Sequence, residues 1–240
     1  MVIKLNKFVS EAGVCARRKA TDLIKNGKIR INNAIIKDPS YEVKLEDKVS
    51  FNNILIKKEK RVYILLNKPK SCISTVSDDC NRKTVLDCIL KKPVKHLYPV
   101  GRLDYNTTGL LLLTNDGDFS QKMAHPKYKV KKVYQATLDM PITERSIEKL
   151  RKGVVLDRAV VSVDSIHTMP FSKKVVKIAL HSGKYRVIHR LLKMCGYRVR
   201  ALDRVRYASF SKQGLKPGSW RLLDEKDINK ALKITSDSSC

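Results

Sequence analysis

Asp104 is the residue of this chain whose surroundings most suggest chemistry. It follows Gly101-Arg102-Leu103 and precedes Tyr105-Asn106-Thr107-Thr108-Gly109. A carboxylate held in a fixed loop can act as a nucleophile in covalent catalysis. An aspartate followed by Asn, Thr and Gly can also be a turn or cap residue, because its short side chain bonds readily to nearby backbone N–H groups. The residue types alone leave both interpretations open.

The charge of the chain indicates the kind of partner on which such a group would act. The 240 residues carry 50 Lys and Arg against 23 Asp and Glu, a formal net charge of +27. Residues 1–60 hold 14 basic and 7 acidic residues, net +7, and the rest holds 36 and 16, net +20. An excess of cations spread over a whole chain repels itself in the compact state, so it is typical of proteins that bind a polyanion. Nucleic acid is therefore the expected partner, ahead of an anionic membrane surface.

The remaining composition disfavours several other classes of protein. Hydrophobic residues make up 42% of the chain, which is enough for a packed core. The longest clean apolar run, Leu110–Leu113, is far shorter than the ~20 residues that a membrane-spanning helix needs. The N-terminus lacks the apolar stretch of a signal peptide. Six cysteines occur without any C-x-x-C pair, which fits reduced thiols rather than a zinc site. We therefore expect a cytoplasmic protein without a bound metal.

Residues 1–60 predict a small domain of two short helices followed by a strand. Apolar residues recur at helical spacing from Leu5 to Ala12 and from Ala20 to Ile24. Glycines 13 and 27 are placed to end these helices, and Asn32-Asn33 predicts a turn between two β-rich pieces. Cations cluster where the second helix begins, although the helix dipole does not favour them there. We expect this cluster to bind nucleic acid; its residues are Arg17, Arg18, Lys19 and Lys25.

The pattern restarts after a charged run near residue 60 and predicts a second domain over residues 61–235. Its strand candidates are Val62–Leu66, Gly109–Thr114, Val133–Leu138, Val160–Val163 and Val175–Leu180, with helices expected at Thr143–Lys152 and Tyr185–Cys195. Strands outnumber helices, and several neighbouring strands look connected by hairpins. We therefore predict an α+β fold, in which a small helix-helix-strand domain precedes a domain with a mixed, mainly antiparallel sheet.

The segment Tyr98–Leu110 resembles the catalytic motif of the pseudouridine synthases, in particular the RsuA-type branch that modifies ribosomal RNA. Further similarities follow in the order that this family shows, at Leu66–Pro69, Lys132–Tyr134 and Leu215–Arg221. Residues 3–50 resemble the S-four RNA-binding domain that many of these enzymes carry. Together the similarities cover nearly all of residues 3–230.

This resemblance implies an isomerase that breaks the glycosidic bond of a uridine, turns the base and rejoins it through carbon. The reaction needs neither a metal nor a cofactor. By motif position Asp104 would be the catalytic carboxylate, and Tyr134 would stack on the flipped base, although a strand tyrosine half in the core is the alternative. The resemblance also implies five substrate-binding cations, of which the first two would meet phosphate or support the loop that carries Asp104: Arg102, Lys68, Lys132, Lys184 and Arg190.

The implied partner is ribosomal RNA or a ribosome assembly intermediate, bound by a monomer. The residues after Asp104 and the Leu110–Leu113 run look more like the enzymes of the large ribosomal subunit. The choice of uridine depends on the shape of the RNA around it, which no residue of this chain reveals.

One motif departs from the family pattern, which is Gly-(Arg/Lys)-x-x-Gln-Val-Arg-Arg. In the family, the first of the final two arginines pairs with the catalytic aspartate. Here Val187 occupies the glutamine position and His189 the arginine position. Histidine is shorter and largely uncharged near neutral pH, and Arg190 lies about 100° further around the helix. By position His189 would be the partner of Asp104. A catalytically degenerate RNA-binding protein of the same fold, acting in ribosome assembly or structure, is the alternative.

Overall fold

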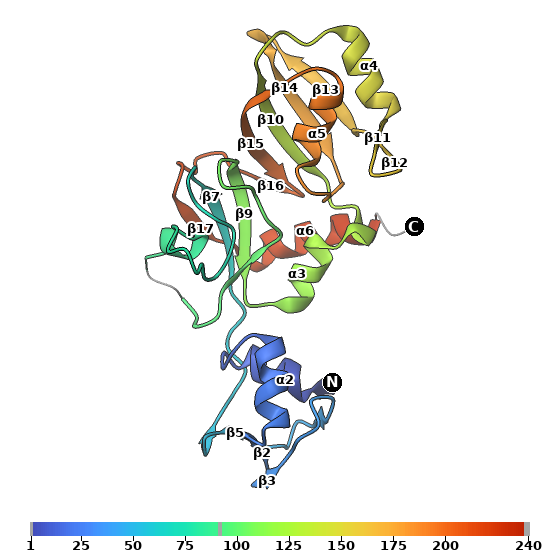
Figure 1. Ribbon diagram of the computed structural model, residues 1–240. Helices are drawn as coiled ribbons and strands as arrows, with labels where there is room; N and C mark the ends of the chain where they lie inside the picture. Colours follow the sequence, from blue (N-terminus) through green and yellow to red (C-terminus); the bar gives the residue numbers. More distant parts are fainter. Residues whose placement is uncertain (1, 91–92, 238–240) are drawn as a thin grey trace. The chain divides into compact units, whose positions relative to one another are not determined.

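The computed structural model describes residues 2–90 and 93–237, with side chains described as far as residue 234 (Figure 1). The chain divides into two compact units. One contains the chain up to Val62 together with a short segment that ends at Leu97, and the other begins at Tyr63 and contains the remainder. None of the helices in the described ranges is long and apolar enough to cross a membrane.

The first unit has the predicted succession of two helices and a strand. Helices α1 (Leu5–Glu11) and α2 (Arg17–Lys25) pack together and lead into β2 (Ile29–Ile31). Each helix buries one face, since its apolar residues recur at helical spacing. The other strands are β1 (Ile3–Lys4), which pairs with β4 (Glu42–Val43), and β3 (Ala34–Ile35), β5 (Val49–Phe51) and β6 (Ile54–Leu55), which join β2 in a sheet of order β3-β2-β5-β6.

The predicted turn at Asn32-Asn33 is confirmed. Both residues have positive φ, 48° and 70°, and they connect the antiparallel strands β2 and β3. Two consecutive residues with positive φ define the tight hairpin turn whose twist matches that of the strands, and asparagine tolerates this conformation better than most residues.

A nine-stranded mixed sheet is the frame of the second unit. Its main order is β13-β14-β10-β15-β9-β7-β17, with β8 beside β9 and β16 beside β15. Only β15 and β9 run parallel within it, so the prediction of a mixed, mainly antiparallel sheet is confirmed for the described part of the chain. The strands are β7 (Tyr63–Lys68), β8 (Tyr98–Val100), β9 (Thr108–Thr114), β10 (Lys132–Leu138), β13 (Ser165–Met169), β14 (Ser172–Leu180), β15 (Val199–Tyr207), β16 (Phe210–Ser211) and β17 (Trp220–Leu222).

Helices and a separate hairpin complete this unit. The helices are α3 (Gly117–Ala124), α4 (Glu144–Lys152), α5 (Val187–Met194) and α6 (Glu225–Asp237), with 3-10 turns η1 (Val85–Cys88) and η2 (Pro126–Tyr128); the hairpin joins β11 (Val154–Leu156) to β12 (Ala159–Val161). Helix α3 was not among the helices predicted from the sequence. Asp116 starts that helix because its carboxylate accepts from the backbone N–H groups of Asp118 and Phe119, at 3.0 and 3.1 Å.

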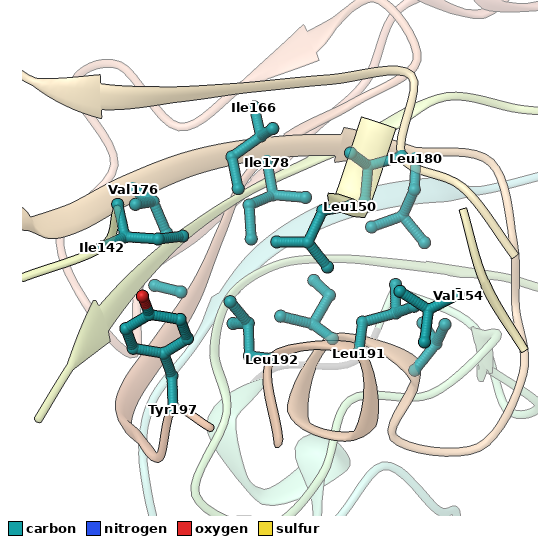
Figure 2. Close-up of a cluster of buried hydrophobic side chains, with 14 of the residues drawn as sticks. Ile142, Leu150, Val154, Ile166, Val176, Ile178, Leu180, Leu191, Leu192 and Tyr197 are labelled. Atoms are coloured by element: carbon teal, nitrogen blue, oxygen red, sulfur yellow. The ribbon is translucent and has the colours of Figure 1, made fainter. Parts of the chain in front are cut away.

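Strand β15 contributes to two hydrophobic cores of the second unit. In one core α4 and α5 cover the sheet, and Figure 2 shows Leu191 and Leu192 of α5 facing Leu150 and Ile178. In the other, β7 and β9 pack against α3 and α6, which lie side by side in Figure 1. Leu202, near the middle of β15, is buried in the first core, and Tyr207, the last residue of the strand, is buried in the second. The strand therefore connects the two halves of the unit.

The parallel contact between β15 and β9 depends on a glycine. Gly109 pairs with Arg204 and has φ of +102°. A Cβ atom at this position would lie 2.3 Å from the carbonyl oxygen of Arg204, closer than real Cβ atoms approach any backbone atom. Only glycine satisfies both this conformation and this approach. The loop that carries Asp104 enters β9 at this point.

Candidate active site

A cavity of about 170 Å³ lies in the second unit, and its lining residues come from separate parts of the chain. Most of them belong to the loop before β9, strand β10, the loop and first turn of α5, and strand β15, and Ala124 at the end of α3 completes the lining. Six of the site residues predicted from the sequence line it: Arg102, Asp104, Lys132, Tyr134, Lys184 and His189. In the part of the chain that the structure describes, no group of three or more His, Cys, Asp or Glu side chains is placed to hold a metal ion.

Lys68 stabilises the loop that carries Asp104 through hydrogen bonds to its backbone. The Lys68 side chain is fully buried, and its Nζ donates to the carbonyl oxygens of Pro69, Tyr105 and Thr107 at 3.0, 3.1 and 2.9 Å. Burial lowers the pKa of Lys68 to about 8. Of the two roles expected for Lys68, the geometry supports loop support and not a phosphate contact, because the ammonium group is enclosed.

A guanidinium group lies beside Asp104, and it belongs to Arg186. Its Nε is 3.6 Å from Oδ2 of Asp104. The two side chains are 47% and 41% exposed, so solvent screens the pair and it adds little to folding stability. Sequence analysis had not assigned Arg186 to this role, because its position in the family motif differs from that of the paired arginine.

His189 shares the cavity with Asp104, as its helix position suggested. Its Nδ1 atom is buried and has no hydrogen-bond partner among the residues that the structure describes. Burial is the main cause that lowers the pKa of His189 below its usual 6.5; the neighbouring Arg186 lowers it further, and Asp104 opposes the shift. The imidazole is therefore neutral at neutral pH, and His189 does not replace the charge of an arginine.

Two further cations that line the cavity lie on strands of the sheet, Lys132 on β10 and Arg204 on β15. Arg204 is 2% exposed; its Nε donates to the carbonyl oxygen of Leu110 at 2.6 Å, and its Nη1 to the hydroxyl of Tyr134 at 3.4 Å. Within the described part of the chain, its buried Nη2 atom has no hydrogen-bond partner. Lys132 is also buried, donates to the Val130 carbonyl oxygen at 3.1 Å, and has its pKa lowered to about 8, by burial first and by Arg204 second. Sequence analysis missed Arg204 because β15 was not among the predicted strands.

A wider groove of about 600 Å³ adjoins the cavity along α5. Arg186 and His189 line both spaces. Arg190, which the family pattern placed among the substrate-binding residues, lines the groove and is not among the residues of the cavity; its Nη1 donates to Asp157 Oδ2 at 2.8 Å. The groove also presents Tyr185, which is 70% exposed, and the exposed cations Lys193 and Arg198. Its composition suits a nucleic-acid strand, which needs cations for phosphates and aromatic faces for bases.

The cations predicted in the first unit lie on α2 and its N-terminal end. Arg17, Arg18, Lys19 and Lys25 are all exposed. Arg17 Nε donates to Asn6 Oδ1 at 3.2 Å. The helix buries Ala20 and Ile24 on its opposite face, so the cations are available to a partner without loss of the hydrophobic core.

Comparison with known proteins agrees with the fold of both units. Residues 62–193 match the RNA pseudouridylate synthase family and residues 3–49 match the S4 domain. The chain is 35% identical to ribosomal large subunit pseudouridine synthase B of Bacillus subtilis over 98% of this chain and 97% of the relative. It is also 35% identical to dual-specificity RNA pseudouridine synthase RluF of Escherichia coli, over 99% and 81%.

A crystal structure of a pseudouridylate synthase aligns with a TM-score of 0.67 and 28% identity, over 95% of this chain and 99% of that one. The matches extend over both units, in the order in which they occur here. The chain therefore belongs to the RNA pseudouridylate synthase family, in its RsuA-type branch with an N-terminal S4 domain.

Proposed function

We propose that this protein converts a specific uridine of ribosomal RNA to pseudouridine, with Asp104 as the catalytic carboxylate. The observation that carries the proposal is the cavity in which Asp104, a guanidinium group and Tyr134 meet. The Bacillus relative is named for the large ribosomal subunit, which favours large-subunit RNA as the substrate here.

The residues of the cavity suggest how the reaction proceeds. The uridine leaves its helix and enters the cavity, where Tyr134 offers an aromatic face to the base. Asp104 then faces the sugar–base linkage while the bond between C1′ of the ribose and N1 of the base breaks and a bond from C1′ to C5 forms. C5 loses its proton and N1 gains one, so that the product is an isomer of uridine. The exposed cations Arg102 and Lys184 bind the phosphates on either side. The bound nucleotide displaces water, which strengthens every charge interaction within the site.

The direct test is to incubate the protein with unmodified ribosomal RNA and to map pseudouridine along both subunits. A new pseudouridine at one position supports the proposal. RNA that binds tightly and gains none would instead favour the degenerate RNA-binding protein, which the neutral His189 in place of an arginine makes a specific second candidate.

We expect Lys68→Met to reduce kcat by about 100-fold, because misplacing a catalytic group by 1 Å costs a factor of this order. The methionine fills the space of the lysine stem but leaves three carbonyl oxygens of the Asp104 loop without a donor. RNA affinity, measured by filter binding, should stay unchanged. The control is Lys70→Met, which removes an exposed charge two residues away. A loss of affinity with normal kcat would show that Lys68 binds RNA.

We propose that residues 1–60 act as an RNA-binding domain through the cations of α2. Replacing Arg17, Arg18, Lys19 and Lys25 by glutamine should reduce the log–log dependence of RNA affinity on salt by up to roughly 3 units, since each lost phosphate contact removes about 0.7–0.9. A control variant removes equal charge from exposed lysines of the second unit: Lys173, Lys174, Lys226 and Lys230. Equal slopes for the two variants would argue against a specific role of α2.

A further inference from the structure

We propose that Arg186 supplies the guanidinium group beside the catalytic carboxylate, in place of the family arginine that His189 has replaced. The positive charge of the active site has thus moved by one helical turn, from position 189 to position 186. This inference rests on the proposed function and concerns the residue that positions Asp104 in that reaction.

The local backbone places Arg186 at the entrance of α5. Arg186 is the N-cap residue of that helix and has a left-handed conformation, with φ of 45° and ψ of 38°. This conformation is unfavourable for a residue other than glycine, because its Cβ lies too close to the following carbonyl oxygen. Such strain gathers at functional sites, where the surrounding structure maintains it. The unfavourable backbone conformation of Arg186 is therefore consistent with a functional role of its side chain in this cavity.

Four other cations in or beside the cavity bond to groups other than Asp104. Nζ of Lys68 bonds to carbonyl oxygens of the Asp104 loop, Nζ of Lys132 to Val130, and Nε of Arg204 to Leu110. Arg102 and Lys184 line the cavity, and Arg190 is paired with Asp157 in the adjoining groove. Among the described residues, Arg186 is the cation that lies within ion-pair distance of Asp104.

His189 is poorly suited to the role that its position implies. Its imidazole is half-buried, lies near Arg186, and has a pKa below the usual value. A second cation one turn from Arg186 would meet the repulsion of the first. A neutral histidine avoids this repulsion. The absence of an arginine at position 189 is therefore compatible with the ion pair between Arg186 and Asp104.

The pair becomes more important when RNA is bound. In the free protein both side chains are nearly half exposed, and water screens their attraction. A nucleotide in the cavity excludes that water, and the same two charges then interact through a medium of lower dielectric constant. Arg186 would then hold the carboxylate in one orientation and stabilise its negative charge before the reaction begins.

The test compares kcat and KM for four variants on the RNA that carries the mapped uridine. We expect Arg186→Gln to lower kcat by about 100-fold, the usual effect of removing one aligned charge from an active site, with KM changed less than threefold. Arg186→Lys should retain an intermediate rate. Lys184→Gln, which removes a cation from the same cavity, should change KM more than kcat. The double variant Arg186→Gln/His189→Arg should recover most of the lost rate, because it returns the guanidinium group to the family position.

The dependence of rate on pH provides a second readout. Arginine stays charged from pH 5.5 to 8.5, so the wild-type rate should not follow the titration of an imidazole. A rate that falls as the pH rises through the imidazole range would assign the cation to His189 and overturn the inference. Arg186→Gln with kcat within threefold of wild type would do the same. Wild-type protein that forms no pseudouridine at all would instead overturn the proposed function, so the two failures are distinct. Melting temperatures of all variants establish that each is folded.

Discussion

Asp104→Asn is expected to abolish pseudouridine formation, lowering the rate by about three orders of magnitude or more. Asparagine keeps the shape of the side chain, but an amide is a poor nucleophile and carries no charge to pair with Arg186. RNA affinity should be unchanged or slightly higher, because the variant removes one negative charge from a cavity that binds a polyanion. The measurement is mapping of pseudouridine under single-turnover conditions, together with filter binding of the same RNA.

The matched control for this experiment is Asp79→Asn, which removes the same charge from an exposed side chain. It should leave rate and affinity at wild-type values. Residual activity of Asp104→Asn above one tenth of wild type corresponds to a barrier increase below about 1.4 kcal/mol. Such a small increase would remove Asp104 from the role of nucleophile.

Gly109→Ala is expected to destabilise the second unit by about 3 kcal/mol or more, the range of substitutions that force strain on a special backbone conformation. The new Cβ would collide with the backbone of Arg204, at 2.3 Å from its carbonyl oxygen, and alanine disfavours a φ of +102°. Neither strand can yield cheaply, because β9 and β15 both belong to the central sheet. Thermal melting should show a decrease of roughly 6–12 °C for a unit of this size.

Gly214→Ala is the matched control, since this glycine also has positive φ, +75°, but its Cβ would meet no atom within 4 Å. It should cost only the backbone preference, about 1–2 kcal/mol. The difference between the two variants isolates the collision. Equal losses would mean that β9 and β15 do not approach each other closely at Gly109.

Local patterns in the sequence determined much of this protein. Apolar residues at helical spacing predicted α1, α2, α4 and α5, and alternating or continuous apolar runs predicted five strands. These patterns are reliable because each describes one buried face of one element. The resemblance of Tyr98–Leu110 to a family motif likewise singled out Asp104, since residues that follow one another in a loop stay together in space.

Strand β15 could not be predicted in the same way. Its sequence, Val199–Tyr207, breaks the alternation of a half-buried strand at Ala201-Leu202 and at Asp203-Arg204, and it carries arginines at 200, 204 and 206. Arg204 is buried only because Gly109 lets the backbones of two strands from distant parts of the chain approach each other, and because Tyr134 and Tyr207 flank its guanidinium group. The burial of Arg204 results from this packing, so the residues next to it in the sequence do not predict it.

The partner of Asp104 shows most clearly what each level decides. The sequence by itself determined that a carboxylate stands in a catalytic motif and that a histidine stands where the family has an arginine. Only the tertiary structure brought Arg186 within 3.6 Å of that carboxylate and left His189 half-buried and neutral. The reason is physical: Asp104 and Arg186 lie on separate loops, so the distance between their charges depends on how β9, β15 and α5 pack. The sequence motif therefore determines which residue types are available, whereas the packing of the strands and the helix determines which charged side chain lies beside Asp104.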